Sequence, residues 1–314
     1  MYLDHLRNNT VTAAAAAEPS VTFMDCMEAA LYCTEVHSAA DAYLIKAEAT
    51  YMATASEDGE GAAKEGWWAK IKKVFEKMHQ VLVGYYQKVV NFIQKTVKPG
   101  IQKKIGQLAV RWKQIGMKSK LEKTEGEADA SKLEGVKYID ADTNADGSMS
   151  KILGSISKKL VESINTDSGE NKLNGEEIKK EMPNISDEKG SFWKSASALK
   201  RSDVVKMVES ITSGNSIKDI LSYVNAIEDQ IKKVKTKIAD EDKKFKAAEK
   251  DKKEADAQAA MQKMSALRGW ITAVSVFANQ LGVVAVKTIV TQADAVNKWL
   301  SACNKKAKAK EDKK

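Results

Sequence analysis

The sequence predicts a mainly α protein built from helical hairpins and long heptad-patterned C-terminal helices, with a small loop-rich middle module. Three observations support this fold class. The 314 residues include only three prolines, while Ala, Lys, Glu and Ile, which suit helices, are abundant. Apolar side chains recur every three or four positions over long stretches, which places them on one face of a helix. Aromatic residues make up only 6% of the chain, and strand-like runs are few.

The first 66 residues are expected to form an acidic helical leader and linker that can be removed from the mature protein. Residues 20–55 contain neither Gly nor Pro, which favours one helix or two short ones. Residues 56–66, SEDGEGAAKEG, contain no apolar side chain larger than alanine. Their composition is typical of an exposed, cleavable linker.

Residues 67–120 are expected to form a basic amphipathic helical hairpin. The apolar residues of its first half follow helical spacing from Trp67 to Val97, and the lysines lie mainly off that face. Pro99 interrupts the pattern, and a second apolar series begins at Ile101. Because both halves have aromatic residues at or near their apolar faces, the two halves can cover each other.

Residues 133–215 are expected to form a small module of short helices and loops. Gly, Asn, Asp and Ser punctuate this segment. Residues 136–141, VKYIDA, are compatible with a short strand, and Phe192 and Trp193 are expected to anchor the module.

Residues 216–303 are expected to form long helices, followed by a basic tail at 304–314. Apolar residues from Ile217 to Phe245 follow the three-four alternation of a coiled coil or long bundle helix, and a second series begins at Leu267. The two series can form an antiparallel hairpin or one long helix in an oligomer. Residues 270–286 carry no charge but contain polar side chains, which favours a buried bundle helix over a membrane span.

Charge is segregated along the chain. Residues 1–63 carry a net charge of −8, residues 64–120 carry +12, and residues 121–314 carry +4. An acidic segment facing a basic one can be neutralised within the molecule, and its removal would expose a strongly cationic surface.

One stretch has the spacing of a calcium loop. Asp142, Asn144, Asp146 and Gly147 match the first half of an EF-hand, in which alternate oxygen-bearing side chains converge on the ion. The twelfth position is Leu153 instead of the bidentate Glu. Calcium is therefore the one cofactor that the sequence suggests, with an Asx-turn and helix cap as the alternative.

No catalytic motif is recognisable. His5, His37 and His79 are isolated, with no nucleophile motif, glycine-rich phosphate loop or paired metal ligands near them. Three scattered cysteines suggest reduced thiols in a cytosolic setting. We therefore expect no enzyme and no small-molecule substrate.

The basic hairpin has three possible roles. Its lysines can be a solvated surface over a packed core, they can contact anionic lipid with tryptophans at the interface, or they can neutralise nucleic-acid phosphates without reading sequence. The residues expected at a polyanion or membrane contact are Lys70, Lys72, Lys73, Lys77, Lys88, Lys95, Lys103, Lys104, Trp67 and Trp68.

The organisation of the chain resembles internal virion proteins of large tailed bacteriophages, especially head core and injected capsid proteins. The resemblance rests on the acidic front segment, the junction SEDGEGAAKEGWW, the lysine-rich helix that follows it, and the ending ALRGWITAVSVFANQLGVVAVKTIVTQADAVNKWLSACNKKAK. It implies trimming by a prohead protease after a glutamate, with a small or apolar residue two positions before. Ala63, Lys64 and Glu65 fit that pattern, and so do Ala55, Ser56 and Glu57. A cut after Glu65 would remove the acidic segment.

The leading hypothesis is a non-enzymatic virion structural protein inside the phage head, present in the host cytoplasm during assembly. Its helices would pack with copies of itself or with other virion proteins, and its basic helices would contact DNA or membrane. A membrane-active or membrane-surface helical protein is the first alternative. A calcium-binding interaction module is the second.

Overall fold

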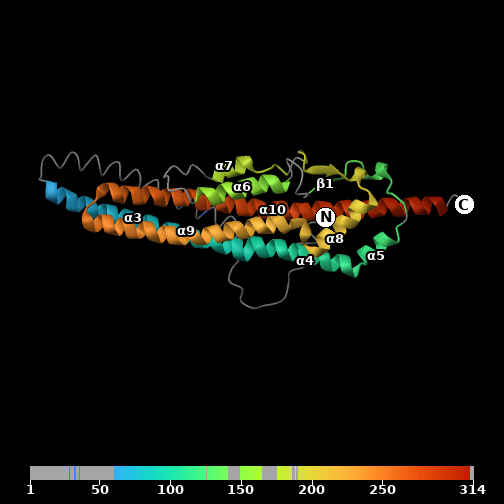
Figure 1. Ribbon diagram of the computed structural model, residues 1–314, viewed down its shortest axis with the longest axis horizontal. Coiled ribbons are helices and arrows are strands. Elements are labelled where there is room, and N and C mark those ends of the chain that lie inside the picture. The colour runs from blue at the N-terminus through green and yellow to red at the C-terminus, as the bar shows by residue number, and fades with distance from the viewer. Residues whose placement is uncertain are drawn as a thin grey trace.

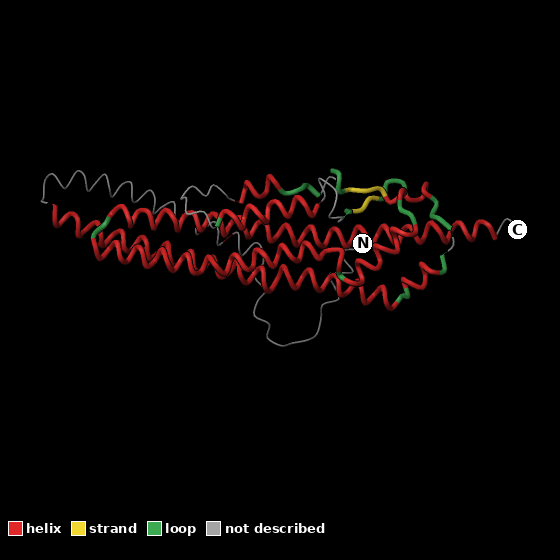
Figure 2. Tube along the Cα trace, in the orientation of Figure 1, coloured by secondary structure: helices red, strands yellow, loops and turns green. Residues whose placement is uncertain are grey.

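The computed structural model describes Glu28, Tyr32 and Glu35 and then residues 60–311, apart from 125, 141–148, 165–174, 186, 187 and 189. The expected mainly α fold class is confirmed, and the two short strands form a single antiparallel pair within the described residues (Figures 1 and 2). The helices are α3 (Glu60–Phe92), α4 (Lys98–Gln114), α5 (Met117–Glu122), α6 (Met149–Ser163), α7 (Gly175–Glu181), α8 (Arg201–Ser213), α9 (Lys218–Asp251) and α10 (Glu254–Glu311). The strands are β1 (Lys137–Ile139) and β2 (Trp193–Ser195).

Three long rods run side by side along the length of the molecule (Figure 1). The first consists of α3 and α4, and the other two are α9 and α10. The contacts of Lys72 with Glu249 and of Gln94 with Glu228 show that α3 and α9 are antiparallel. The shorter helices α6, α7 and α8 lie against this bundle.

The hairpin expected over residues 67–120 is wrong, because α3 continues into α4. A π-helical turn, Ile93–Val97, joins the two helices, and the Lys98 N–H donates to the Ile93 carbonyl. Pro99 lies in the first turn of α4, where its missing N–H is tolerated.

The spacing of the buried residues explains the π-helical turn. Val89, Ile93, Val97, Ile101 and Ile105 are buried at intervals of four. In an α-helix each interval of four moves a side chain about 40° around the axis, so five such residues would leave the core side. The wider π-helical turn compensates for this rotation and keeps both helices on the core.

Helices α9 and α10 form the hairpin that was one of the two arrangements expected for residues 216–303. Lys252 ends α9 in the left-handed conformation, with φ +57°. The N–H groups of Lys252 and Lys253 donate to the carbonyls of Glu249 and Ala248, which completes the turn. The coiled-coil interpretation of the apolar repeat stays a prediction.

Two apolar clusters form the core. The larger one joins α3, α6, α9 and α10, and the smaller one surrounds the C-terminal part of α10 with residues of α4, α5 and α8. The middle segment contributes to both, with Ile139 and Leu153 in the larger cluster and Tyr138 and Val204 in the smaller one. The short helices and loops expected in this segment are present, and they share the core of the bundle.

Side chains of α10 hold the middle segment in place. The indole N–H of Trp270 donates to the Leu160 carbonyl at 2.9 Å, and that of Trp299 donates to the Leu199 carbonyl at 3.0 Å. The strand expected in VKYIDA is present as β1, in which Ile139 pairs with Trp193. Gln292 of α10 donates to the Ile139 carbonyl at 3.0 Å. The central helix thus binds the polar backbone of the segments that cover it.

Among the described residues, α10 is the one helix whose length and apolar composition would allow it to cross a membrane. Its most apolar window has a mean hydropathy of 1.6 and is 61% buried. Trp270, Ile271, Val274 and Phe277 are all buried. In this structure most of the residues between 270 and 286 are buried or half-buried in the bundle, as expected, and Val283 is exposed.

Loss of a stacked ring pair should destabilise the bundle. Phe75 of α3 and Phe245 of α9 are both 1% exposed, and their ring centroids are 3.8 Å apart. Phe245→Ala is expected to lower the free energy of unfolding in urea by about 3–5 kcal/mol, because it leaves a cavity between two helices. As a control, Val283→Ala alters a side chain that is 46% exposed and should change this free energy by less than about 0.5 kcal/mol. Equal losses in the two variants would contradict the packing described.

Candidate polyanion-binding surface

Lysines of α3 form an exposed row on one side of the helix. Lys70, Lys73, Lys77 and Lys88 are exposed and are spaced by three, four and eleven residues, which places them on one side of an α-helix. These four residues are called the lysine stripe below. The opposite side of α3 carries the buried apolar residues, so the stripe faces away from the core.

The other lysines expected at the contact are placed differently. Lys72 forms a 3.1 Å ion pair with Glu249 of α9, which holds it against the bundle. Lys95 lies in the π-helical turn and Lys103 on α4, and both are exposed, whereas Lys104 is half-buried. The eight lysines therefore do not form one patch. The four lysines of the stripe are the ones that lie on the same side of the helix.

The expectation that Trp67 and Trp68 contact lipid or nucleic acid is wrong in this packed structure. Trp67 is 6% exposed and Trp68 is 2% exposed. Their rings meet edge to face at 4.8 Å, and the Lys252 ammonium lies 5.4 Å from the Trp68 ring centre. Both tryptophans close the end of the bundle beside the α9–α10 turn, because their large apolar surface is more stable away from water.

The described part of the acidic N-terminal segment lies against the stripe. The Lys77 ammonium is 5.6 Å from the centre of the Tyr32 ring. Glu28 and Tyr32 line a hollow of about 460 Å³ together with Lys77, Val81 and Lys88. The contact between the N-terminal segment and α3 at these positions is made by the Tyr32 ring, and charge neutralisation between the two segments stays a prediction.

Two other predicted sites are described only in part or not at all. Asp142, Asn144 and Asp146 lie outside the described residues, and no cluster of possible metal ligands is found within the described part. The linker predicted at 56–66 is wrong in its second half, because residues 60–66 belong to α3. Ala, Lys and Glu favour helix there. Glu65, the predicted processing site, therefore lies in the second turn of a helix.

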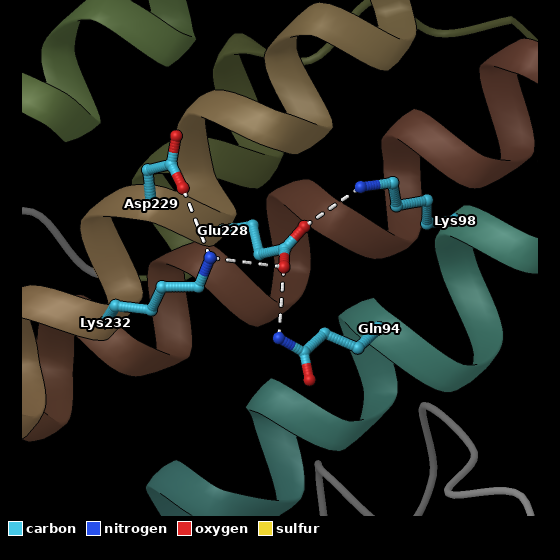
Figure 3. Close-up of polar contacts among 5 residues, drawn as sticks. All are labelled: Gln94, Lys98, Glu228, Asp229 and Lys232. Atoms are coloured by element: carbon cyan, nitrogen blue, oxygen red, sulfur yellow. Dashed lines mark hydrogen bonds and ion pairs between the residues drawn. The ribbon is translucent and has the colours of Figure 1, made fainter.

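A half-buried carboxylate, that of Glu228, ties the π-helical turn to α9 (Figure 3). Glu228 accepts hydrogen bonds from Gln94 Nε2 at 3.0 Å and from Lys98 Nζ at 3.2 Å. Lys232 Nζ lies 3.5 Å from Glu228 Oε1 and 3.3 Å from Asp229 Oδ1. The Glu228 side chain is only 14% exposed, so these contacts act in a poorly solvated place.

The same contacts keep Glu228 ionised. Burial alone would raise the pKa of Glu228, but hydrogen bonds from Gln94 and Lys98 and the charges of Lys98 and Lys232 outweigh burial and lower it. This cluster could not be predicted from the sequence, because Gln94 and Glu228 are 134 positions apart and neither belongs to a motif. Only the packing of the π-helical turn and the start of α4 against α9 brings these residues together.

Comparisons with known proteins found no matching family model, no matching curated protein and no matching solved structure.

The Glu228 cluster should make stability depend on pH. Because the pKa of Glu228 is lower in the folded than in the unfolded chain, its contribution is present above the unfolded-state pKa and is lost as pH falls through the folded-state pKa. Glu228→Gln is expected to cost about 1–2 kcal/mol at neutral pH. The free energy of unfolding of this variant should also fall less than that of the original chain when the pH is lowered from about 5 to about 3.

The matched control is Glu162→Gln on α6, where the side chain is 62% exposed and pairs with Lys158 at 3.7 Å. Its effect should be within about 0.5 kcal/mol at every pH. An unchanged pH profile in Glu228→Gln would contradict the role of this cluster.

Proposed function

We propose that this protein is a non-enzymatic structural protein of a bacteriophage virion, located inside the head, whose lysine stripe contacts packaged DNA without reading its sequence. The layout of the chain, which resembles that of internal phage head proteins, supports the virion role. The observation that carries the DNA contact is the stripe itself, a row of exposed cations on a continuous helix whose opposite side is buried.

The dimensions of the stripe suit a phosphate backbone. Lys70 and Lys88 are 18 residues apart, which corresponds to about 27 Å along an α-helix. Phosphates of one DNA strand are spaced by about 3.4 Å, so the stripe can follow several of them. Most of the large apolar side chains of α3 are in the core, so we expect the contact to depend on charge and to weaken as the salt concentration rises.

Packing with other copies or with other virion proteins would use different surfaces. Val110 is 57% exposed on α4, and Val283 and Val290 are each 46% exposed on α10. Each is an apolar side chain available on the outside of the bundle.

The second candidate is a membrane-active role, and one observation favours it. Helix α10 has the length and apolar composition of a membrane-spanning helix. In that role the bundle would open and expose α10 to lipid. The DNA proposal needs no such opening.

Salt-dependent DNA binding tests the proposal with two matched triple variants of the full chain. Lys70→Gln, Lys73→Gln and Lys77→Gln remove three charges from one side of α3, and Lys233→Gln, Lys235→Gln and Lys250→Gln remove three exposed charges from different sides of α9. The first triple should reduce the slope of log affinity against log salt by about 2–3, because each phosphate contact contributes about 0.9. The second triple should leave the slope nearly unchanged.

Fluorescence anisotropy with duplexes of unrelated sequence supplies the measurement, and all sequences should bind alike. Anionic vesicles are the competing partner. Equal slopes in the two triples would overturn the assignment of the stripe. Vesicle leakage at moderate salt without DNA binding would favour the membrane-active role.

A further inference from the structure

A polar cavity lies away from the lysine stripe, where five elements meet. It has a volume of about 410 Å³ and is lined by residues of β1, α6, α8, α9 and α10 or by residues directly beside them. This volume is sufficient for a small organic molecule. The cavity plays no part in the proposed DNA contact, so the two proposals can fail separately.

The charges around the cavity are mostly negative. Among the described residues, its wall contains three carboxylates, Asp140 after β1, Asp203 in the first turn of α8 and Asp219 in the first turn of α9. One cation, Lys206, also lines it. Burial, followed by the charges of Asp140 and Asp203, raises the pKa of Tyr138 in the same wall to about 12. The cavity therefore favours a cation over an anion.

Two buried polar side chains in the wall are incompletely satisfied. Thr288 is fully buried and Gln292 is 6% exposed, and both belong to α10. Among the described residues, the Thr288 Oγ1 and Gln292 Oε1 atoms have no hydrogen-bond partner, although Gln292 Nε2 donates to the Ile139 carbonyl. Unpaired buried oxygens are costly, and a bound molecule that donates hydrogen bonds would remove that cost.

The rest of the lining consists of apolar side chains and of hydroxyl and amide groups. Ser150 donates to Asp219 Oδ2 at 3.2 Å, which fixes the position of that carboxylate. Met149, Met207, Ile217 and Ile220 provide apolar surface between the acidic groups. The carboxylates come from different elements and do not form a metal-ligand cluster within the described residues. Such an arrangement suits a ligand with separated cationic ends and an apolar stem.

From this combination we propose that the cavity binds an aliphatic diamine. Its ammonium groups pair with the carboxylates of Asp203 and Asp219, and its methylene chain lies on the Ile and Met side chains. The unpaired oxygens of Thr288 and Gln292 lie just beneath the cavity wall, and they accept hydrogen bonds from an ammonium, or from a water molecule that it holds, once these side chains turn toward the cavity. No bond is made or broken, and binding stabilises the junction of α6, α8 and α9 with α10.

Isothermal titration of the full chain with 1,4-diaminobutane is the direct test, with 1,4-butanediol as a neutral ligand of the same length. The diamine is expected to bind and to raise the melting temperature, and the diol to do neither. Asp219→Asn keeps the shape of the side chain and should weaken diamine binding by about tenfold, since one charge-assisted contact is lost. Asp294→Asn is the matched control on α10, because its side chain is 51% exposed and lies outside the cavity, and it should bind as the original chain does.

Thr288→Val provides a second test that does not depend on charge. It removes an unpaired buried hydroxyl, so the unliganded protein should be as stable as before or more stable, while diamine binding weakens severalfold. Circular dichroism confirms that each variant is folded. Equal binding of diol and diamine, or unchanged diamine binding in both Asp219→Asn and Thr288→Val, would overturn the proposal. Stabilisation by calcium without any response to the diamine would overturn it as well.

Discussion

The apolar surface of α10 is the constraint on which the positions of the other elements depend. The most apolar window of this helix is 61% buried in the bundle, and removing such side chains from water is the main favourable contribution to folding. Helices α3 and α9 cover one part, α6 and α7 another, and α4, α5 and α8 surround the C-terminal part. The two indole N–H groups of Trp270 and Trp299 find backbone carbonyls, so these large side chains are buried with their polar atoms paired.

Charge is distributed over this apolar framework in two ways. Some lysines of the first rod are held by acidic residues of α9, as in the pairs of Lys72 with Glu249 and Lys98 with Glu228. Others, such as Lys70 and Lys73, are exposed on the outer side of α3. The first group aligns α3 with α9 and contributes to stability, whereas the second group contributes little to folding. The exposed lysines are therefore the ones available to an external partner.

Sequence reasoning succeeded where one periodic pattern determined an element. The apolar series from Ile217 to Phe245 and the one that begins at Leu267 predicted long helices, either as a hairpin or as one continuous helix, and the structure has the hairpin. The uncharged residues 270–286 predicted a buried bundle helix. It failed where the outcome depended on distant partners. Pro99 predicts an interruption of the helix. In the structure the chain stays helical on both sides of Pro99, and a hydrogen bond from Lys98 to Glu228 holds this part of the helix against α9. The sequence predicts Trp67 and Trp68 at a surface. Their burial could not be foreseen, because it depends on packing near Lys252, which is far away along the chain.

The π-helical turn at Ile93–Val97 also changes the direction in which side chains of α4 point around the helix axis, relative to those of α3. A wide turn of this kind accommodates one residue more than a regular α-helical path. A row of lysines on one side of α3 therefore does not continue on the same side of α4, even though the two helices follow one another along the rod. Gain or loss of a single residue should be tolerated best at this point, since elsewhere in the rod it would turn every following side chain by about 100°.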